Sequence, residues 1–469
     1  MANDLLQGKK TNAAIWRLGL PMILSMVLQA LYNVVDTAFV INMGTEGAAA
    51  NLALTYAFPI QILMIAVGVG TGVGINALLS RSLGEGDREK AGRVAGNGLL
   101  IGVVLCLLFV LFGLFGAEGF IRMQANGNEL VTRLGTEYLQ IVCIVSVGSI
   151  GFAIVERFLQ ATGKTLYSTV GQIVGALANI ALDYVFIYPL DMGVAGAAWA
   201  TVAGQILSLL VTLFFHICKN PDIDKRMAYC LPRAGIIKEI YHIGFSAMLM
   251  QGLLSVMMLG VNLILGLSED FEILTGTFGI YYKIQQMALF ACFGLSNTLI
   301  TMTSFGYGMR DRTRLLEIRR YGVLDSIIVS GVILVLFEVF AYPIAYLFGL
   351  SAGTASGEIV HTCTTAIRLA SLGYVFMGVT VGIQGILQGL RQAMAPLLLS
   401  ALRLAVFVFP LVFAFTWTAR PRTFVWLAFP IAECLTMLVA ILCMKRVSNR
   451  VIDVLPEHHA PKSVSTAEN

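Results

Sequence analysis

The chain has 469 residues, of which 57% are hydrophobic and only 12% are charged. Soluble globular proteins carry roughly twice that share of charged residues, so a soluble fold is excluded, and the large apolar content equally excludes a disordered chain. The net charge of +4 does not indicate nucleic-acid binding, because the basic residues lie between apolar runs. The composition predicts an integral membrane protein surrounded by a lipid bilayer.

Apolar runs long enough to cross a bilayer as helices follow one another along the chain. One crossing takes about 20 residues. The runs begin near Ala14, Leu52, Ala91, Gly135, Tyr167, Gly193, Ile236, Thr275, Leu315, Ile359, Ala393 and Thr423. We therefore expect an all-α polytopic membrane protein with twelve transmembrane helices.

The lysines and arginines predict the orientation of these helices. If the N-terminus is cytoplasmic, 24 of the 31 basic residues lie in inner segments, 4 lie in outer loops and 3 lie inside spans. Inner loops of membrane proteins carry an excess of Lys and Arg. We expect both termini to be cytoplasmic and the protein to be a monomer in the cell (inner) membrane.

The second half of the sequence repeats the first. A shift of 224 residues aligns Ile60-Gln61 with Ile284-Gln285, Gly70 with Gly294, and Gly84 with Gly308. Parallel repeats of this kind build transporters in which two lobes rock about a central cavity. We expect two six-helix lobes related by a pseudo-two-fold axis along the membrane normal. The expected parts are an N-terminal lobe at 1–218, a cytoplasmic linker at 219–238, a C-terminal lobe at 239–446 and a polar cytoplasmic tail at 447–469.

Polar side chains in three spans of the first lobe are predicted to reach a similar depth in the membrane. They are Gln29, Tyr32, Asn33 and Asp36 on one face of the first span, Asn179 and Asp183 on the fifth, and Thr201 and Gln205 on the sixth. At about 1.5 Å of rise per residue, they meet in the outer half of the bilayer. Two carboxylates among neutral oxygens suit a shared proton or a small cation, and the alternative is a structural network of hydrogen bonds.

Charged residues elsewhere in the spans have simpler readings. Glu156 with Arg157 fits an ion pair at the membrane interface, and Arg403 and Glu433 on consecutive spans are able to pair. We expect the substrate cavity to be lined by Gln29, Asn33, Gln205, Lys283 and Arg368, where the two basic side chains would disfavour cations. Pro21 removes one backbone hydrogen bond and is able to kink the first span.

No other pattern indicates catalysis or a bound cofactor. The eight cysteines show no spacing typical of zinc ligands, and we expect no structural metal and no disulfides. The spans contain no nucleophile–base pair, so we do not expect an enzyme.

Five motifs of the sequence are typical of one known family. The first four are Pro21 followed by Tyr32-Asn33-Val34-Val35-Asp36-Thr37, the loop Ser80-Arg81-Ser82-Leu83-Gly84-Glu85-Gly86-Asp87, the segment Phe158-Leu159-Gln160-Ala161-Thr162-Gly163-Lys164, and Asn179-Ile180-Ala181-Leu182-Asp183. The fifth is Gly193-Val194-Ala195-Gly196-Ala197-Ala198-Trp199-Ala200-Thr201, in the sixth span. These motifs resemble the multidrug and toxic compound extrusion (MATE) transporters, most of all their prokaryotic MepA/DinF-like branch.

The resemblance implies an antiporter that exports small amphipathic organic compounds or drugs by alternating access, coupled to H⁺ or Na⁺ and without another cofactor. It implies that Asp36 and Asp183 bind the coupling cation, with Tyr32, Asn179 and Thr201 as partners, and that Pro21 is a kink that responds to protonation. The alternative function is a flippase for a lipid-linked or anionic substrate, which the basic residues of the second lobe would favour.

Overall fold

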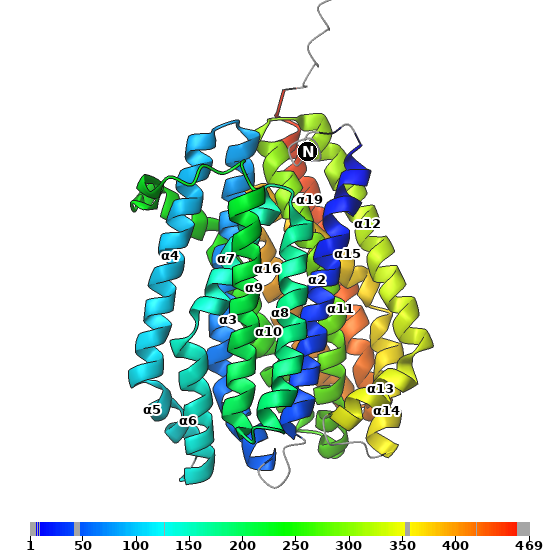
Figure 1. Cartoon of the computed structure of the whole chain (residues 1–469). Helices are drawn as coiled ribbons and strands as arrows, with labels where there is room; N and C mark the ends of the chain where they lie inside the picture. The colour runs from blue at the N-terminus through cyan, green and yellow to red at the C-terminus, as the bar shows by residue number, and fades with distance from the viewer. Residues whose placement is uncertain are drawn as a thin grey trace, which may run out of the picture.

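A computed structural model describes residues 6, 8, 10–41, 47–125, 127–351, 357–418 and 420–456 of the chain. Figure 1 shows a bundle of long helices that run roughly along one direction. Within the described residues, ten helices are long and apolar enough to cross a membrane, and twelve spans result if each of two bent helix pairs counts as one. Helices prevail because every backbone N–H and C=O in hydrocarbon must be paired within its own segment.

The first half of the chain provides six of these spans. They are α2 (Thr11–Ile41), α3 (Gly47–Gly84), α4 (Arg88–Phe115), α6 (Glu129–Ile144) with α7 (Val147–Ala161), α8 (Thr165–Ile187) and α9 (Gly193–Lys219). A short helix, α5 (Ala117–Gln124), connects α4 to α6.

The second half repeats this order. Its spans are α10 (Ala234–Leu265), α11 (Phe271–Gly308), α12 (Arg312–Val339), α14 (Gly357–Ser371) with α15 (Tyr374–Gly389), α16 (Met394–Leu402) continued by η3 (Arg403–Val408) and α17 (Phe409–Thr416), and α18 (Pro421–Phe424) continued by η4 (Val425–Leu427), α19 (Ala428–Val447) and η5 (Ser448–Ile452). The connecting helix α13 (Ala341–Ser351) follows α12. All twelve spans begin close to the predicted positions.

The bends in the fourth and tenth spans were not predicted. The axis turns by 41° between α6 and α7 and by 53° between α14 and α15. Because these two spans are equivalent in the repeat, the bends indicate that the two halves share a three-dimensional plan as well as sequence motifs.

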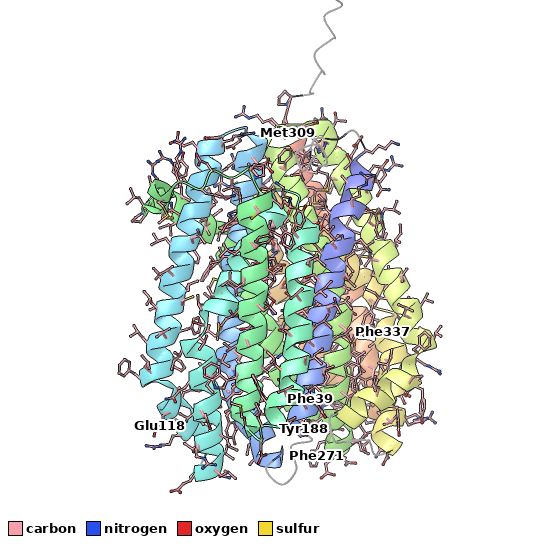
Figure 2. The ribbon with its side chains drawn as sticks, viewed as in Figure 1. Phe39, Glu118, Tyr188, Phe271, Met309 and Phe337 are labelled. Atoms are coloured by element: carbon pink, nitrogen blue, oxygen red, sulfur yellow. The ribbon has the colours of Figure 1, made fainter. Side chains whose placement is uncertain are left out.

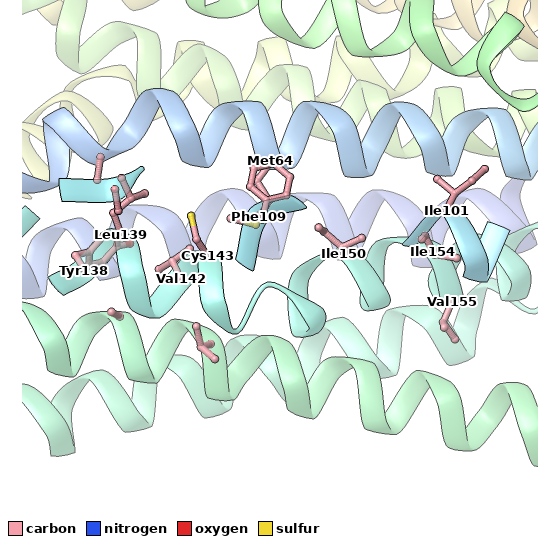
Figure 3. Close-up of a cluster of buried hydrophobic side chains, with 14 of the residues drawn as sticks. Met64, Ile101, Phe109, Tyr138, Leu139, Val142, Cys143, Ile150, Ile154 and Val155 are labelled. Carbon is pink, nitrogen blue, oxygen red and sulfur yellow. The ribbon is translucent and has the colours of Figure 1, made fainter. Parts of the chain in front are cut away.

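Each half has its own apolar core, and a third cluster joins the two. Figure 3 shows the core of the first half, where side chains such as Met64, Phe109 and Tyr138 from different helices pack together. The third cluster contains Ile15 and Leu18 of α2 together with residues of α11, α12, α15 and α19. The beginning of α2 therefore packs in the second half, and Figure 1 shows α2 running between the two halves.

The segment between α9 and α10 lies against α4. It contains one short turn, η2 (Met227–Cys230). The side chain of Asn97 on α4 accepts a hydrogen bond from the backbone N–H of Arg233 (2.8 Å) and donates to the carbonyl of Tyr229 (3.3 Å). The predicted linker is thus attached to the first half along part of its length.

Glycines bring backbones of the two halves into direct contact. A Cβ atom on Gly84 would lie 2.2 Å from the carbonyl oxygen of Phe305, and one on Gly308 would lie 2.3 Å from that of Arg81. The contact is reciprocal, because the shift of 224 residues that relates the glycines also relates Arg81 to Phe305. This is the arrangement that a pseudo-two-fold axis between the halves requires.

The contact closes one end of the bundle, which we call the closed end. There the guanidinium of Arg81 lies 5.2 Å from the ring centre of Tyr307, and Asn76 donates a hydrogen bond to Thr301 (3.0 Å) across the two halves. Met309, which follows this contact, is labelled at the end of the bundle in Figure 2 that carries the start of α2 in Figure 1.

Alanine at Gly84 or Gly308 should destabilise the protein, because the added methyl group meets backbone that cannot move aside. We expect each substitution to lower the free energy of unfolding by about 1–3 kcal/mol, measured by denaturant titration of the purified protein. Gly331→Ala is the control, since nothing lies within 4 Å of that position. Equal stability of all three variants would contradict the close contact.

Candidate functional site

Five of the predicted polar residues line one cavity in the first half. This first cavity has a volume of about 110 Å³. Its lining includes Gln29 and Tyr32 of α2, Asn179 of α8, and Thr201 and Gln205 of α9. The structure therefore brings together the side chains that the sequence placed at one depth on three different spans.

Close packing of α8 on α9 positions these groups. A Cβ atom on Gly175 would lie 2.6 Å from the carbonyl oxygen of Gly204, and one on Gly204 would lie 2.9 Å from Cβ of Asn179. The two glycines allow the backbones to approach, as small residues commonly do in membrane helices. Asn179 is buried, and its amide has no hydrogen-bond partner among the described residues, so it is available to a ligand in the cavity.

Only one of the two predicted carboxylates is described at the side-chain level. Asp183 is fully buried on α8, one turn from Asn179. Asp36 and Asn33 belong to α2, but their side chains lie outside the described residues. That Asp36 and Asn33 lie at the first cavity stays a prediction.

Pro21 lies inside α2, which continues through it from Thr11 to Ile41. The hydroxyl of Thr169 on α8 donates a hydrogen bond to the carbonyl of Pro21 (2.8 Å). This bond attaches α2 to α8 at the proline, while the preceding residues of α2 pack in the second half. The role of Pro21 as a moving kink stays a prediction.

A second cavity lies between the two halves and shares a wall with the first. This central cavity has a volume of about 100 Å³ and is lined from α2, α3, α7, α10, α11 and α15. Its polar lining consists of neutral amides, a serine and one charged group: Gln29, Gln251, Asn297, Gln384, Gln388, Ser296 and Arg157. Phe290 and Phe293 contribute aromatic surface.

Glu156 and Arg157 do not form the interfacial pair that the sequence suggested. Both are buried, Glu156 at 5% exposure and Arg157 at 2%. Gln160 bridges them, since its amide donates to Glu156 (2.6 Å) and accepts from Nη1 of Arg157 (2.9 Å). Both line the first cavity, and Arg157 also lines the central one. The expectation was wrong because the end of α7 is covered by neighbouring helices, which an isolated span does not reveal.

Of the basic residues considered in the second half, only Arg403 lines a described cavity, a small third one of about 40 Å³ next to the central cavity. Arg403 pairs with Glu433 (3.0 Å), which confirms the predicted ion pair. Lys283 is half-buried and Arg368 is exposed, and neither lines the described cavities. Arg368 lies on α14, before the 53° bend that leads into α15.

The MatE family model matches residues 21–185 and 246–414. The chain belongs to the MatE family. The two matched segments begin in α2 and α10 and end in α8 and α17, which are equivalent spans of the two halves. The same model thus fits each half of this MatE-family chain, as the internal repeat predicts.

Named relatives and solved structures extend the likeness over nearly the whole MatE-family chain. The multidrug export protein MepA of Staphylococcus saprophyticus subsp. saprophyticus is 24% identical over 431 residues, which cover 92% of this chain and 93% of MepA. A crystal structure of MATE in complex with MaL6 has a TM-score of 0.90 at 24% identity and covers 96% of this chain and 99% of that one.

A second solved structure is an outward-facing conformation of a multidrug resistance MATE family transporter of the MOP superfamily. Its TM-score is 0.88 at 24% identity, with coverage of 96% of this chain and 98% of that one. These likenesses, with the ten to twelve spans, confirm the predicted twelve-helix fold of two lobes.

One further buried carboxylate of the MatE-family chain was not predicted. Asp325 on α12 is fully buried and accepts a hydrogen bond from the indole N–H of Trp16 on α2 (3.1 Å). An acidic residue in the middle of the ninth span was the available signal. The bond is a second polar connection between α2 and its neighbours, this time to the second half.

Removal of one member of the Arg403–Glu433 pair should be more harmful than removal of both. Arg403→Met leaves a buried carboxylate without its partner, which costs about 3–5 kcal/mol of stability. Arg403→Met combined with Glu433→Leu should recover most of that loss, as measured by denaturant titration. If the double variant is as unstable as the single one, the unpaired carboxylate of Glu433 is not the source of the lost stability.

Proposed function

We propose that the chain is a cation-coupled antiporter that exports amphipathic organic compounds by alternating access. One observation carries the proposal: the first cavity, which Tyr32, Asn179 and Thr201 line, shares a wall with the central cavity. Asp183 lies one helical turn beyond Asn179. The shared lining consists of Met26, Gln29, Ile65, Val69 and Arg157. A cation bound in the first cavity therefore alters the wall of the cavity that holds the substrate.

The coupling ion in this proposal is H⁺ or Na⁺. A carboxylate such as Asp183 takes up a proton, and carboxylate, amide and hydroxyl oxygens are hard ligands that suit a small cation. Charged groups buried in a bilayer are expensive and commonly mark ion pathways. This supports Asp36 and Asp183 as the ion-binding pair, with Tyr32, Asn179 and Thr201 as neutral partners.

The transport step would use the two halves as rigid lobes. The reciprocal glycine contact holds them together at the closed end, and the central cavity lies between them away from that contact. With the termini in the cytoplasm, the closed end is the cytoplasmic one, and the substrate would leave toward the outside. Cation binding would then favour separation of the closed end, with α2 moving because it contacts both lobes.

The names of relatives support export of organic compounds. Both MepA and the outward-facing transporter are described as multidrug proteins. Aromatic and thioether side chains beside neutral amides in the central cavity suit amphipathic molecules of varied shape. We place the protein in the cell membrane.

The flippase alternative has less support than the sequence suggested. It rested on basic residues in the second lobe, but Arg403 is paired with Glu433, and Lys283 and Arg368 do not line the described cavities.

Liposomes with purified protein provide the test. A pH gradient and a Na⁺ gradient are imposed in separate experiments. The movement of a fluorescent amphipathic dye is measured in each. We expect one gradient to drive transport in the wild type and Asp36→Asn and Asp183→Asn to reduce it to background, because neither variant has the ionisable carboxyl group. Asp191→Asn, in an exposed loop after α8, is the matched control and should transport normally. Coupled transport that survives in both cavity variants would refute the assigned site.

A further inference from the structure

Arg157 lies where the two cavities meet. It is on α7, about one turn before that helix ends at Ala161, and it lines both the first and the central cavity. The hydroxyl of Ser80 on α3 donates to the carbonyl of Ala161 (3.4 Å), and the next residue of α3, Arg81, takes part in the closed-end contact. Arg157 therefore lies on the closed-end side of both cavities.

The guanidinium of Arg157 has donors left for a ligand. Its Nη1 donates to Gln160 (2.9 Å), and its Nε has no hydrogen-bond partner among the described residues. The side chain is only 2% exposed, so an unsatisfied donor there has a substantial desolvation cost. Nε lies against Gly72 of α3, so a ligand in the cavity would accept from the remaining N–H groups of Nη1 and Nη2.

The neighbouring helix makes room for the guanidinium. A Cβ atom on Gly72 of α3 would lie 3.0 Å from Cγ and 3.2 Å from Nε of Arg157. Any larger residue at this position would press against the side chain. The position of the guanidinium at the cavity wall thus depends on a close contact with another helix, as well as on its own rotamer.

Glu156 compensates the charge of Arg157 but leaves part of its guanidinium available for other hydrogen bonds. Gln160 lies between the two, and Glu156 lines the first cavity but not the central one. Among the described residues that line the central cavity, Arg157 is the only charged one. The central cavity therefore presents one positive group to its contents, and the compensating carboxylate belongs to the adjacent cavity.

The other residues that line the central cavity determine what kind of molecule fits beside the guanidinium of Arg157. Phe290 and Phe293, with ring centres 6.3 Å apart, and the thioethers of Met26 and Met250 offer surface to a flat apolar body. Four glutamines and an asparagine supply neutral donors and acceptors around it. A phosphate or diphosphate head group carries more negative charge than one guanidinium neutralises, whereas a single carboxylate matches it and bonds it in two places.

We propose that Arg157 binds the carboxylate of amphipathic aromatic acids or zwitterions in the central cavity, so that the transported compounds include carboxylate-bearing molecules. The direction of transport rests on the function proposed above, but the binding site does not. The shared wall with the first cavity places this anion site beside the groups assigned to the coupling cation.

The test uses a small fluorescent aromatic acid, coumarin-3-carboxylic acid, and its methyl ester, which differ by one carboxylate on the same ring system and suit the small central cavity. Binding to the purified full-length protein is measured by fluorescence anisotropy, with no ion gradient. We expect the wild type to bind the acid at least about tenfold more tightly than the ester, the discrimination typical of a charge-assisted hydrogen bond. Arg157→Gln should remove this preference, and Arg157→Lys should retain part of it.

Glu156→Gln separates an anion site from a purely structural ion pair. If Arg157 binds the carboxylate, this variant should bind the acid more tightly, because the competing negative charge is gone. If Arg157 only balances Glu156, the variant leaves the ratio of acid to ester affinity unchanged, which overturns the proposal. The variant with both Glu156→Gln and Arg157→Gln controls for folding, since it leaves no unpaired charge at either position.

Three further outcomes distinguish this proposal from the proposed transport function. Equal affinity of the wild type for acid and ester, or no binding of the acid, overturns the anion site whatever the liposome assay shows. A preference for the acid that depends on Arg157, together with no gradient-driven transport, supports the anion site and counts against antiport. An anionic lipid vesicle that displaces the acid only through Arg157 would assign the site to a lipid carboxylate or phosphate instead.

Discussion

In a bilayer, helices gain little by burying apolar surface against one another, because the surrounding lipid is as apolar as a protein core. The two halves of this chain depend instead on close approach of their backbones. Gly70 and Gly244 allow α3 and α10 to touch, since a Cβ on either would lie within 2.8 Å of the other's carbonyl oxygen. Together with the Gly84 and Gly308 contacts, this seam determines which end of the bundle is closed and where space remains between the halves.

Because the bilayer core holds almost no water, each buried charge needs a polar partner within the protein. Arg403 has Glu433, Asp325 has the indole of Trp16, and Arg157 reaches Glu156 through Gln160. The first two are enclosed by helices from different parts of the chain and connect those helices. The third borders both the first and the central cavity, which is why it has a functional interpretation and the others have a structural one.

Much of the architecture was predictable because it depends on local properties of the sequence. The length of each apolar run limits its number of crossings, and helical periodicity alone puts Asn179 one turn from Asp183 and Gln29 near Tyr32. Gln29, Tyr32 and Asn179 do meet at one cavity, whereas Asp183 is buried one turn away from Asn179 and does not line it. The side chains of Asp36 and Asn33 are outside the described part. The bends at α7 and α15 were not predictable, because apolar composition alone does not show where an axis turns.

The sequence by itself determined the membrane location of the chain, its twelve apolar runs, the repeat and the depth of its polar groups, because composition, run length and period act within single helices. Only the tertiary structure decided which side chains share a cavity. In that structure Arg157 lines two cavities instead of lying at the membrane interface, Arg368 is exposed, and Arg403 forms an ion pair with Glu433. Those outcomes depend on contacts between helices far apart in the chain, where glycines and bends set distances that no single helix encodes.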